Sequence, residues 1–142
     1  MPSFIQSNTQ QGLIVRNPLP SVDFTNAEGL LAKISSSSGN TIGLQYVDLA
    51  GVGDIPLYVV TEVEVATGEA QRVTLQPLMN NRNVRGIASA AINAGVQVAS
   101  AAGGQLRAAT TGDYVIGITE DAVSASGQYV LFRPAFVGGT HA

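Results

Sequence analysis

The segment from Thr110 to Pro134 constrains the fold more than any other part of the chain. The pair Gly112-Asp113 predicts a turn, because glycine adopts positive φ without steric cost and aspartate caps its own backbone. Tyr114–Thr119 and Gln128–Arg133 are rich in β-branched and aromatic residues, which favours two strands. Pro134 ends the second strand, because proline has no N–H for a sheet ladder. The segment therefore predicts a strand, a turn and a strand.

A similar pattern occurs earlier in the chain, between Val52 and Pro77. Its pair Gly53-Asp54 matches Gly112-Asp113. The other matches are Thr61-Glu62 with Thr119-Glu120, Gly68 with Gly127, Asn26-Ala27 with Asn93-Ala94, and Gln71, Val73, Leu75 and Pro77 with Gln128, Val130, Phe132 and Pro134. These matches predict two related β units in tandem. The alternative is a chance agreement between short patterns of Gly, Thr and Val.

The remaining patterns extend this prediction to an all-β chain. Short apolar runs recur about every 8–12 residues between turn signals, which is typical of a sandwich or barrel. We expect ten to twelve short strands in two tandem small β-barrel or β-sandwich units. The predicted organisation is an N-terminal arm at 1–20, a first β unit at 21–80, and a second β unit with a short tail at 81–142.

The predicted arm carries two apolar clusters separated by a polar run. They are Phe4-Ile5 and Leu13-Ile14-Val15. An extended arm with such anchors can dock on a neighbouring protein by adding a strand to a sheet edge. The alternatives are an unstructured terminus and a first strand that pairs inside its own unit.

Composition limits the possible partners. Charged residues make up 12% of the 142-residue chain, against about 25% in a typical domain, and the net charge is −3. One lysine and six scattered arginines do not form the basic patch that nucleic acid requires. The uncharged stretch 86–106 is mainly Ala, Gly, Ser and Gln, so we expect no membrane span. The absence of cysteine is compatible with folding in a reducing cytoplasm.

Few side chains are suited to catalysis. His141 is the only histidine and lies next to the last residue. Glu62 and Glu64 share one strand face and could hold a metal, but a solvated face explains them as well. Glu62 and Glu120 occupy matching places, and would suit glycoside hydrolysis only if the two units faced each other. We therefore expect no enzyme activity, no cofactor and no metal site.

The segment Ile92–Pro134 resembles the core of tailed-bacteriophage capsid decoration (cement) proteins. The positions that carry the resemblance are Ala94-Gly95 with Val98, Gly112-Asp113, Gly117-Ile118, Gly127 and Val130. The match covers about a third of the chain, and the first unit follows the pattern more loosely, with Tyr58 near the place of Gly117 and with Pro56 intruding.

The resemblance implies a structural virion protein made in the host cytoplasm and bound to the capsid exterior. Such a protein bridges neighbouring major capsid protein subunits as a homotrimer, or alternatively as a homodimer. The capsid-contact candidates are Phe4, Ile5, Leu13, Ile14 and Val15. The alternative functions are a phage tail or fibre module that binds carbohydrate or protein and, third, a hydrolase that uses Glu62 and Glu120.

Overall fold

The computed structural model describes residues 13–36, 39, 43, 45–64 and 71–135. These residues contain ten strands and a 3₁₀ turn at Ala102–Gly104, and no α-helix lies among them. The strands are β1 (Ile14–Arg16), β2 (Leu31–Ile34), β3 (Val47–Leu49), β4 (Tyr58–Val63), β5 (Val73–Pro77), β6 (Val84–Ile87), β7 (Gln97–Ser100), β8 (Leu106–Ala108), β9 (Gly117–Thr119) and β10 (Tyr129–Pro134). The all-β prediction is confirmed.

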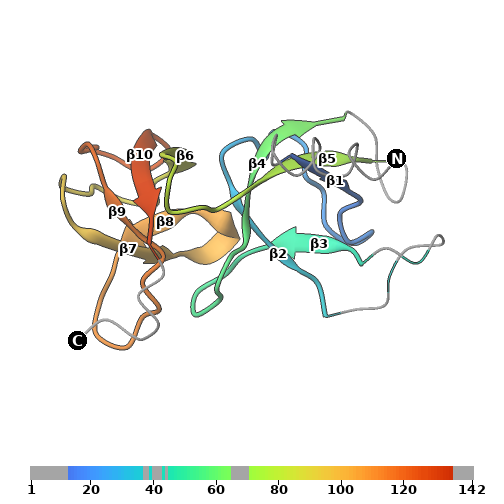
Figure 1. Cartoon of the computed structure of the whole chain (residues 1–142), viewed down its shortest axis with the longest axis horizontal. Helices are drawn as coiled ribbons and strands as arrows, with labels where there is room; N and C mark the ends of the chain where they lie inside the picture. Colours follow the sequence, from blue (N-terminus) through green and yellow to red (C-terminus); the bar gives the residue numbers. More distant parts are fainter. Residues whose placement is uncertain (1–12, 37–38, 40–42, 44, 65–70, 136–142) are drawn as a thin grey trace.

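The strands form two five-stranded antiparallel sheets with the same topology (Figure 1). The first sheet has the order β1-β5-β4-β2-β3, and the second has the order β6-β10-β9-β7-β8. Strand for strand, β1 to β5 therefore correspond to β6 to β10. The register agrees, because Tyr58 lies opposite Pro77 in the first sheet and Gly117 lies opposite Pro134 in the second.

Backbone hydrogen bonds outside the ladders repeat in the same way. The Gly29 N–H donates to the Val60 carbonyl at 2.8 Å, and the Gly95 N–H donates to the Thr119 carbonyl at 2.9 Å. Three further N–H to carbonyl hydrogen bonds of the first sheet each have an equivalent in the second. In the first sheet they run from Leu57 to Ala32, from Leu78 to Leu57 and from Asp54 to Gly51. Their equivalents run from Ile116 to Val98, from Ala135 to Ile116 and from Asp113 to Thr110. The predicted tandem β units are therefore present, and the matches are not chance agreement.

Each sheet is closed into a small barrel by one parallel bridge. Pro18, just after β1, bridges Val47 in β3, and Ala88, just after β6, bridges Leu106 in β8. The Leu19 N–H donates to the Val47 carbonyl at 2.8 Å, and the Ser89 N–H donates to the Leu106 carbonyl at 2.7 Å. Closure removes the open sheet edges that would otherwise pair with other chains. We call the two closed sheets the first barrel and the second barrel.

Two sequence matches are wrong by one residue. Register places Val60, not Thr61, at the position of Thr119, because β4 has a bulge between Val60 and Glu62 that inserts one residue. Likewise, Gly29 corresponds to Gly95, so Ala27 and not Asn26 corresponds to Asn93. Beyond the bulge the match of Glu62 with Glu120 is confirmed, because Glu62 lies opposite Thr74 and the Glu120 N–H donates to the carbonyl of Leu131, the equivalent of Thr74. Gly68 lies outside the described residues. The matches of Val73, Leu75 and Pro77 with Val130, Phe132 and Pro134 are confirmed.

Residues 14–16, which the sequence assigns to an arm, form β1 and pair with β5 along Ile14–Leu75, Val15–Thr74 and Arg16–Val73. The alternative in which this stretch pairs inside its own unit is therefore the one that the structure shows. The first sheet begins at residue 14 and not at the predicted boundary of 21. Alternating side chains of β1 are partly covered while Val15 is exposed.

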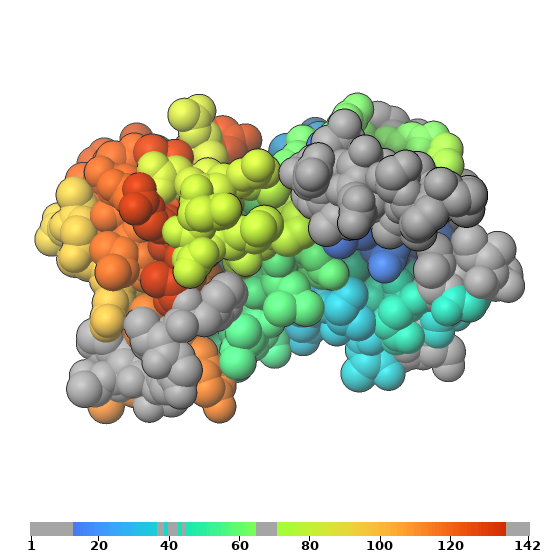
Figure 2. Space-filling view, viewed as in Figure 1, coloured from blue at the N-terminus to red at the C-terminus, as the bar shows by residue number. Residues whose placement is uncertain are grey.

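The two barrels lie side by side along the long axis of the molecule and pack directly on each other (Figure 2). Side chains inside the first barrel form one cluster: Phe24, Ala27, Ala32, Val47, Val60, Val73 and Leu75. The cluster inside the second barrel contains Val98, Leu106, Ile116, Val130 and Phe132, and it also includes Leu31, Ala50, Val59 and Leu78 of the first barrel. Because strand residues alternate in direction, Val60 points into its own barrel while Val59 points towards the second barrel.

Two glycines make room for the largest side chain of the second core. A Cβ at Gly117 would stand 2.5 Å from the Arg133 carbonyl oxygen and 2.8 Å from Cδ2 of Phe132. A Cβ at Gly86 would collide with Cδ1 of Leu106 and stand 3.2 Å from Cε1 of Phe132. The first barrel has Leu75 at the place of Phe132, and it carries Tyr58 and Arg16 at the places of the two glycines. The Phe132 ring thus explains why a glycine stands at position 117 in β9.

Candidate functional site

The two Gly-Asp turns singled out by the sequence have the same geometry. Gly53 has φ 84° and Gly112 has φ 92°, so both use the left-handed region that glycine tolerates. In the first turn, the Asp54 carboxylate accepts a 2.7 Å hydrogen bond from the Gly51 N–H and pairs with Lys33 Nζ at 2.7 Å. The hydrogen bond from Lys33 is the main reason that the pKa of Asp54 lies below its usual value, against the opposing effect of burial.

The second turn is held more extensively. The Asp113 carboxylate accepts 2.7 Å and 2.9 Å hydrogen bonds from the N–H and hydroxyl of Thr110, and pairs with Arg107 at 2.7 Å. Burial is the largest single influence on Asp113 and raises its pKa. The bonds from Thr110 and Arg107 together outweigh burial, so the pKa is lowered. Both turns are therefore rigid, charge-assisted structures.

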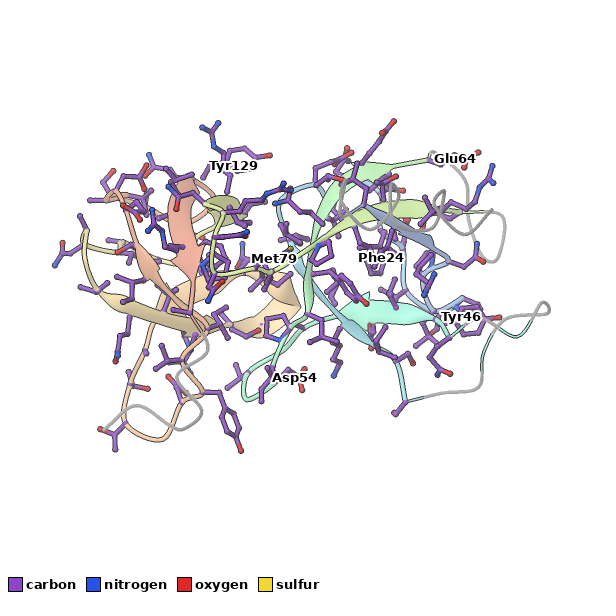
Figure 3. All side chains as sticks on the ribbon, viewed as in Figure 1. Phe24, Tyr46, Asp54, Glu64, Met79 and Tyr129 are labelled. Carbon is purple, nitrogen blue, oxygen red and sulfur yellow. The ribbon has the colours of Figure 1, made fainter. Side chains whose placement is uncertain are left out.

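Each turn presents a large apolar side chain at the same position. Ile55 is 47% exposed and Tyr114 is 44% exposed, and both follow their turn aspartate directly. The first turn adds Val52 and Leu57, which are also exposed. The β3–β4 and β8–β9 connections project from the same long side of the molecule, at the bottom of Figure 1, where Figure 3 labels Asp54. The molecule thus offers two equivalent apolar contact points on rigid supports.

Ile55 and Tyr114 were missed by sequence reasoning, although a signal was present. The offset of 59 residues that relates Gly53 to Gly112 also relates Ile55 to Tyr114. Sequence alone does not distinguish these two exposed side chains from Ile116, which lies two residues after Tyr114 and is buried.

The N-terminal candidates divide into two groups. Phe4 and Ile5 lie outside the described residues. Leu13 and Val15 are 49% and 52% exposed, and Ile14 is partly covered in β1. The predicted capsid contact of these residues stays a prediction.

The acidic candidates lie on exposed strand surface. Glu64 pairs with Arg72 at 2.8 Å, beside Glu62, Val15 and Thr74 in a shallow depression. Glu120 pairs with Arg133 at 3.2 Å in the second barrel. Among the described residues there is no group of three or more His, Cys, Asp or Glu side chains that could hold a metal ion. Glu62 and Glu120, the two glutamates of the hydrolase hypothesis, are thus both exposed and belong to different barrels.

A groove of about 250 Å³ runs along the junction of the barrels. The first barrel lines it with residues including Gly29, Val59, Thr61 and Gln76, and the second barrel with Asn83, Val84, Arg85 and Tyr129. Tyr129, labelled at the top of Figure 3, lies with its ring against Gly29, where a Cβ would be 2.8 Å from Cε1. The groove is therefore part of the contact between the barrels.

In the part of the chain that the structure describes, no helix has the length and apolar character to cross a lipid bilayer. No protein-family model matches the chain, and no curated protein sequence matches it either. Among solved structures, the chain is similar to the head fiber gp8.5 N base of bacteriophage phi29, with a TM-score of 0.64 at 17% sequence identity. The alignment covers 87% of this chain and 92% of that chain. The likeness therefore extends over both barrels and shows a shared fold.

Proposed function

We propose that the chain is a structural protein of a bacteriophage virion, bound to the outer surface of the assembled capsid. The observation that carries this proposal is the likeness in fold, over both barrels, to the base of a phage head fibre. The resemblance of Ile92–Pro134 to capsid decoration proteins supports the same location. In this proposal the chain bridges neighbouring major capsid protein subunits and has no catalytic role, cofactor, nucleic-acid partner or membrane partner.

The twin turns supply the geometry for bridging. Ile55 and Tyr114 stand at equivalent places on two barrels that are fixed relative to each other by a shared core. When two contacts are linked rigidly, formation of the first raises the effective concentration of the second, so the pair binds more tightly than either contact alone. Partly exposed aromatic and aliphatic side chains on a rigid support are typical anchors of protein interfaces.

A second candidate function is the base module of a fibre, which would carry a further host-binding segment away from the capsid. The observation that favours it is that the similar solved chain is itself a head fiber base. Both candidates require attachment to the phage head, and they differ in whether the capsid becomes more stable. Carbohydrate binding through Ca²⁺ at Glu62 and Glu64 is disfavoured by the ion pair between Glu64 and Arg72.

Cosedimentation with phage shells that lack the protein tests attachment. We expect the wild-type chain to pellet with the shells, and Ile55→Ser combined with Tyr114→Ser to reduce the bound amount by roughly tenfold or more. Met79→Gln is the matched control, because Met79 is 44% exposed but lies on the link between the barrels. Wild-type chain that stays in the supernatant at saturating concentration would remove the proposal.

A thermal release assay then separates the two candidates. Capsid bridging predicts that decorated shells retain their DNA to a higher temperature than bare shells, whereas a fibre base predicts binding with no change. A truncation that removes residues 2–12 tests whether the N-terminal candidates Phe4 and Ile5 contact the capsid. Removing residues 2–16 would also delete β1 and its pairing with β5.

A further inference from the structure

The groove along the junction of the barrels has an apolar floor. Val59, Val60 and Val84 line it, and each of them is at most 3% exposed. Val59 is covered because the second barrel packs against it, whereas Ile118, its equivalent in β9, is 41% exposed. The floor is therefore created by the contact between the two barrels and is fixed by the core that they share.

The walls of the groove are polar and come from both barrels. Glu28, Thr61 and Gln76 belong to the first barrel, and Asn83 and Arg85 belong to the second. Thr61, Asn83 and Arg85 are exposed, and the other two are partly covered. Sites for small ligands combine an apolar lining with a few convergent polar groups, and they occur preferentially where two domains meet.

Most of these polar groups are not used by the fold. Glu28, Gln76 and Arg85 make no side-chain hydrogen bond or ion pair with any residue in the described ranges. Asn83 uses only its Oδ1, which accepts a 3.1 Å hydrogen bond from Arg133 Nε, so both of its amide N–H groups stay available. The groove thus gathers donors and acceptors that a ligand can engage without breaking an existing contact.

Tyr129 adds an aromatic surface at the edge of the groove. It begins β10 and is 53% exposed, although Cε1 of its ring lies against Gly29 of the first barrel. Gly29 has φ 89°, and a Cβ there would stand 2.8 Å from that ring carbon. The backbone of one barrel therefore supports the ring of the other, and such a rigid aromatic side chain loses little conformational entropy on binding.

The charges in the groove favour a neutral ligand. Glu28 and Arg85 carry opposite charges, so an anion would meet the carboxylate and a cation would meet the guanidinium. A carboxylate accepts hydrogen bonds, a guanidinium donates them, and an amide side chain does both. A ligand with several hydroxyl groups can satisfy all three, because each hydroxyl both donates and accepts.

We propose that this groove binds a neutral saccharide. The C–H face of a sugar ring packs on Tyr129 and the valine floor, while its hydroxyl groups bond to Glu28, Gln76 and Arg85. The volume of about 250 Å³ lies just below the roughly 300–1,000 Å³ of drug-sized pockets, which suits a short saccharide end. The site needs no metal and is separate from Glu62 and Glu64.

The groove and the twin turns lie on opposite long sides of the molecule. Figure 3 labels Tyr129 at the top and Asp54 at the bottom. A chain that contacts a capsid through its turns would therefore direct the groove outwards, where a glycan on a cell surface can reach it. Saccharide binding by the isolated chain does not itself rest on capsid attachment.

An array of immobilised neutral and anionic saccharides, probed with the full chain, tests the proposal. We expect binding to neutral saccharides that is unchanged by a chelator, and a loss of about tenfold or more in Tyr129→Ala and in Arg85→Gln. Tyr114→Ala and Arg82→Gln are the matched controls, because both residues are exposed outside the groove. These two should bind like the wild type, and circular dichroism melts verify folding of all four variants.

The saccharide bound most strongly on the array is then titrated in soluble form against the ¹⁵N-labelled chain. Shifts of the amide signals of Gly29, Thr61, Gln76 and Arg85 are expected, with those of Gly53 and Gly112 unchanged. Equal competition by the monosaccharide and the longer glycan would identify a free sugar as the ligand, and competition by the longer glycan alone would identify a surface glycan. Absence of binding on the array, binding to anionic saccharides only, or full binding by both Tyr129→Ala and Arg85→Gln would each overturn the proposal.

Discussion

Asp113 and Asp54 accept the same backbone hydrogen bonds in equivalent turns, but their cations come from different strands. Arg107 lies in β8, whereas Lys33 lies in β2, which corresponds to β7. Lys33 lies opposite Asp48 in the first barrel, and the equivalent residues Ala99 and Arg107 lie opposite each other in the second. The cation therefore stands on one strand of this pair in the first barrel and on the other strand in the second. Both turn aspartates therefore have a cation partner, and the two barrels take it from different strands of the same pair.

The acid stability of the protein is expected to depend on these two carboxylates. Both have a folded-state pKa below the usual value of 3.8, so each stabilises the fold fully above that value. This stabilisation is lost as the pH falls below about 3.8 and through the lower folded-state pKa. Asp113→Asn should flatten the pH dependence of the melting temperature in that window. A melting curve for Asp113→Asn that is shifted by the same amount at every pH would contradict this assignment.

The two ion pairs are expected to differ in strength. Arg107 and Asp113 are 26% and 13% exposed, whereas Lys33 and Asp54 are 34% and 31% exposed. Double-mutant cycles in chemical denaturation should give a coupling of about 1–2 kcal/mol for the pair in the second barrel and at most about 0.5–1 kcal/mol for the first. Equal couplings would show that solvent screening does not separate the two turns.

Gly117→Ala is expected to destabilise the second barrel by about 2–4 kcal/mol. The added methyl group meets the Arg133 carbonyl oxygen and the Phe132 ring, and backbone in a paired strand has little room to move. Gly51→Ala is the control, since its added methyl group meets only the Asp54 carboxylate at an ordinary 3.4 Å. Phe132→Leu, which introduces the side chain of the first barrel, should relieve only the ring contact. Urea denaturation of the single and double variants measures both effects.

Gly104→Ala is expected to weaken the junction of the barrels. Its Cβ would stand 2.8 Å from the Leu31 carbonyl oxygen, and its φ of 79° is unfavourable for alanine. We expect a loss of about 1–3 kcal/mol and faster amide hydrogen exchange at Gly104 and Ala50. Gly103→Ala serves as the control, because Gly103 has a similar φ of 69° and no atom within 4 Å of the added methyl group. Equal losses in the two variants would assign the effect to backbone strain alone.

The sequence predicts the repeated unit because its turns use residues with narrow conformational roles. Gly53, Gly112, Pro77 and Pro134 mark places where few other residues fit, and their matches are confirmed by register and by φ. The one-residue error in the match of Thr61 with Thr119 arises at a place where the sequence has no such marker. A β-bulge adds a residue without requiring a distinctive side chain, so the sequence does not reveal that Val60, and not Thr61, corresponds to Thr119.

The barrel closure and the exposed surfaces could not be predicted from the sequence. Leu13-Ile14-Val15 has the composition of either a docking arm or a strand, and its pairing depends on β5, about 60 residues away. The burial of Val59 and the exposure of Ile118 depend on which barrel has a neighbour, and local sequence does not carry that information. The distinction follows only from the packing of one duplicate on the other.

Barrel topology also determines how the chain responds to mechanical load. In each barrel the first and last strands are antiparallel neighbours, with Ile14 opposite Leu75 and Val84 opposite Phe132. Tension applied through the chain ends would therefore peel these strands apart one hydrogen-bonded pair at a time. Force applied through the side surfaces of the barrels would instead be shared across whole strands and not concentrated at their tips.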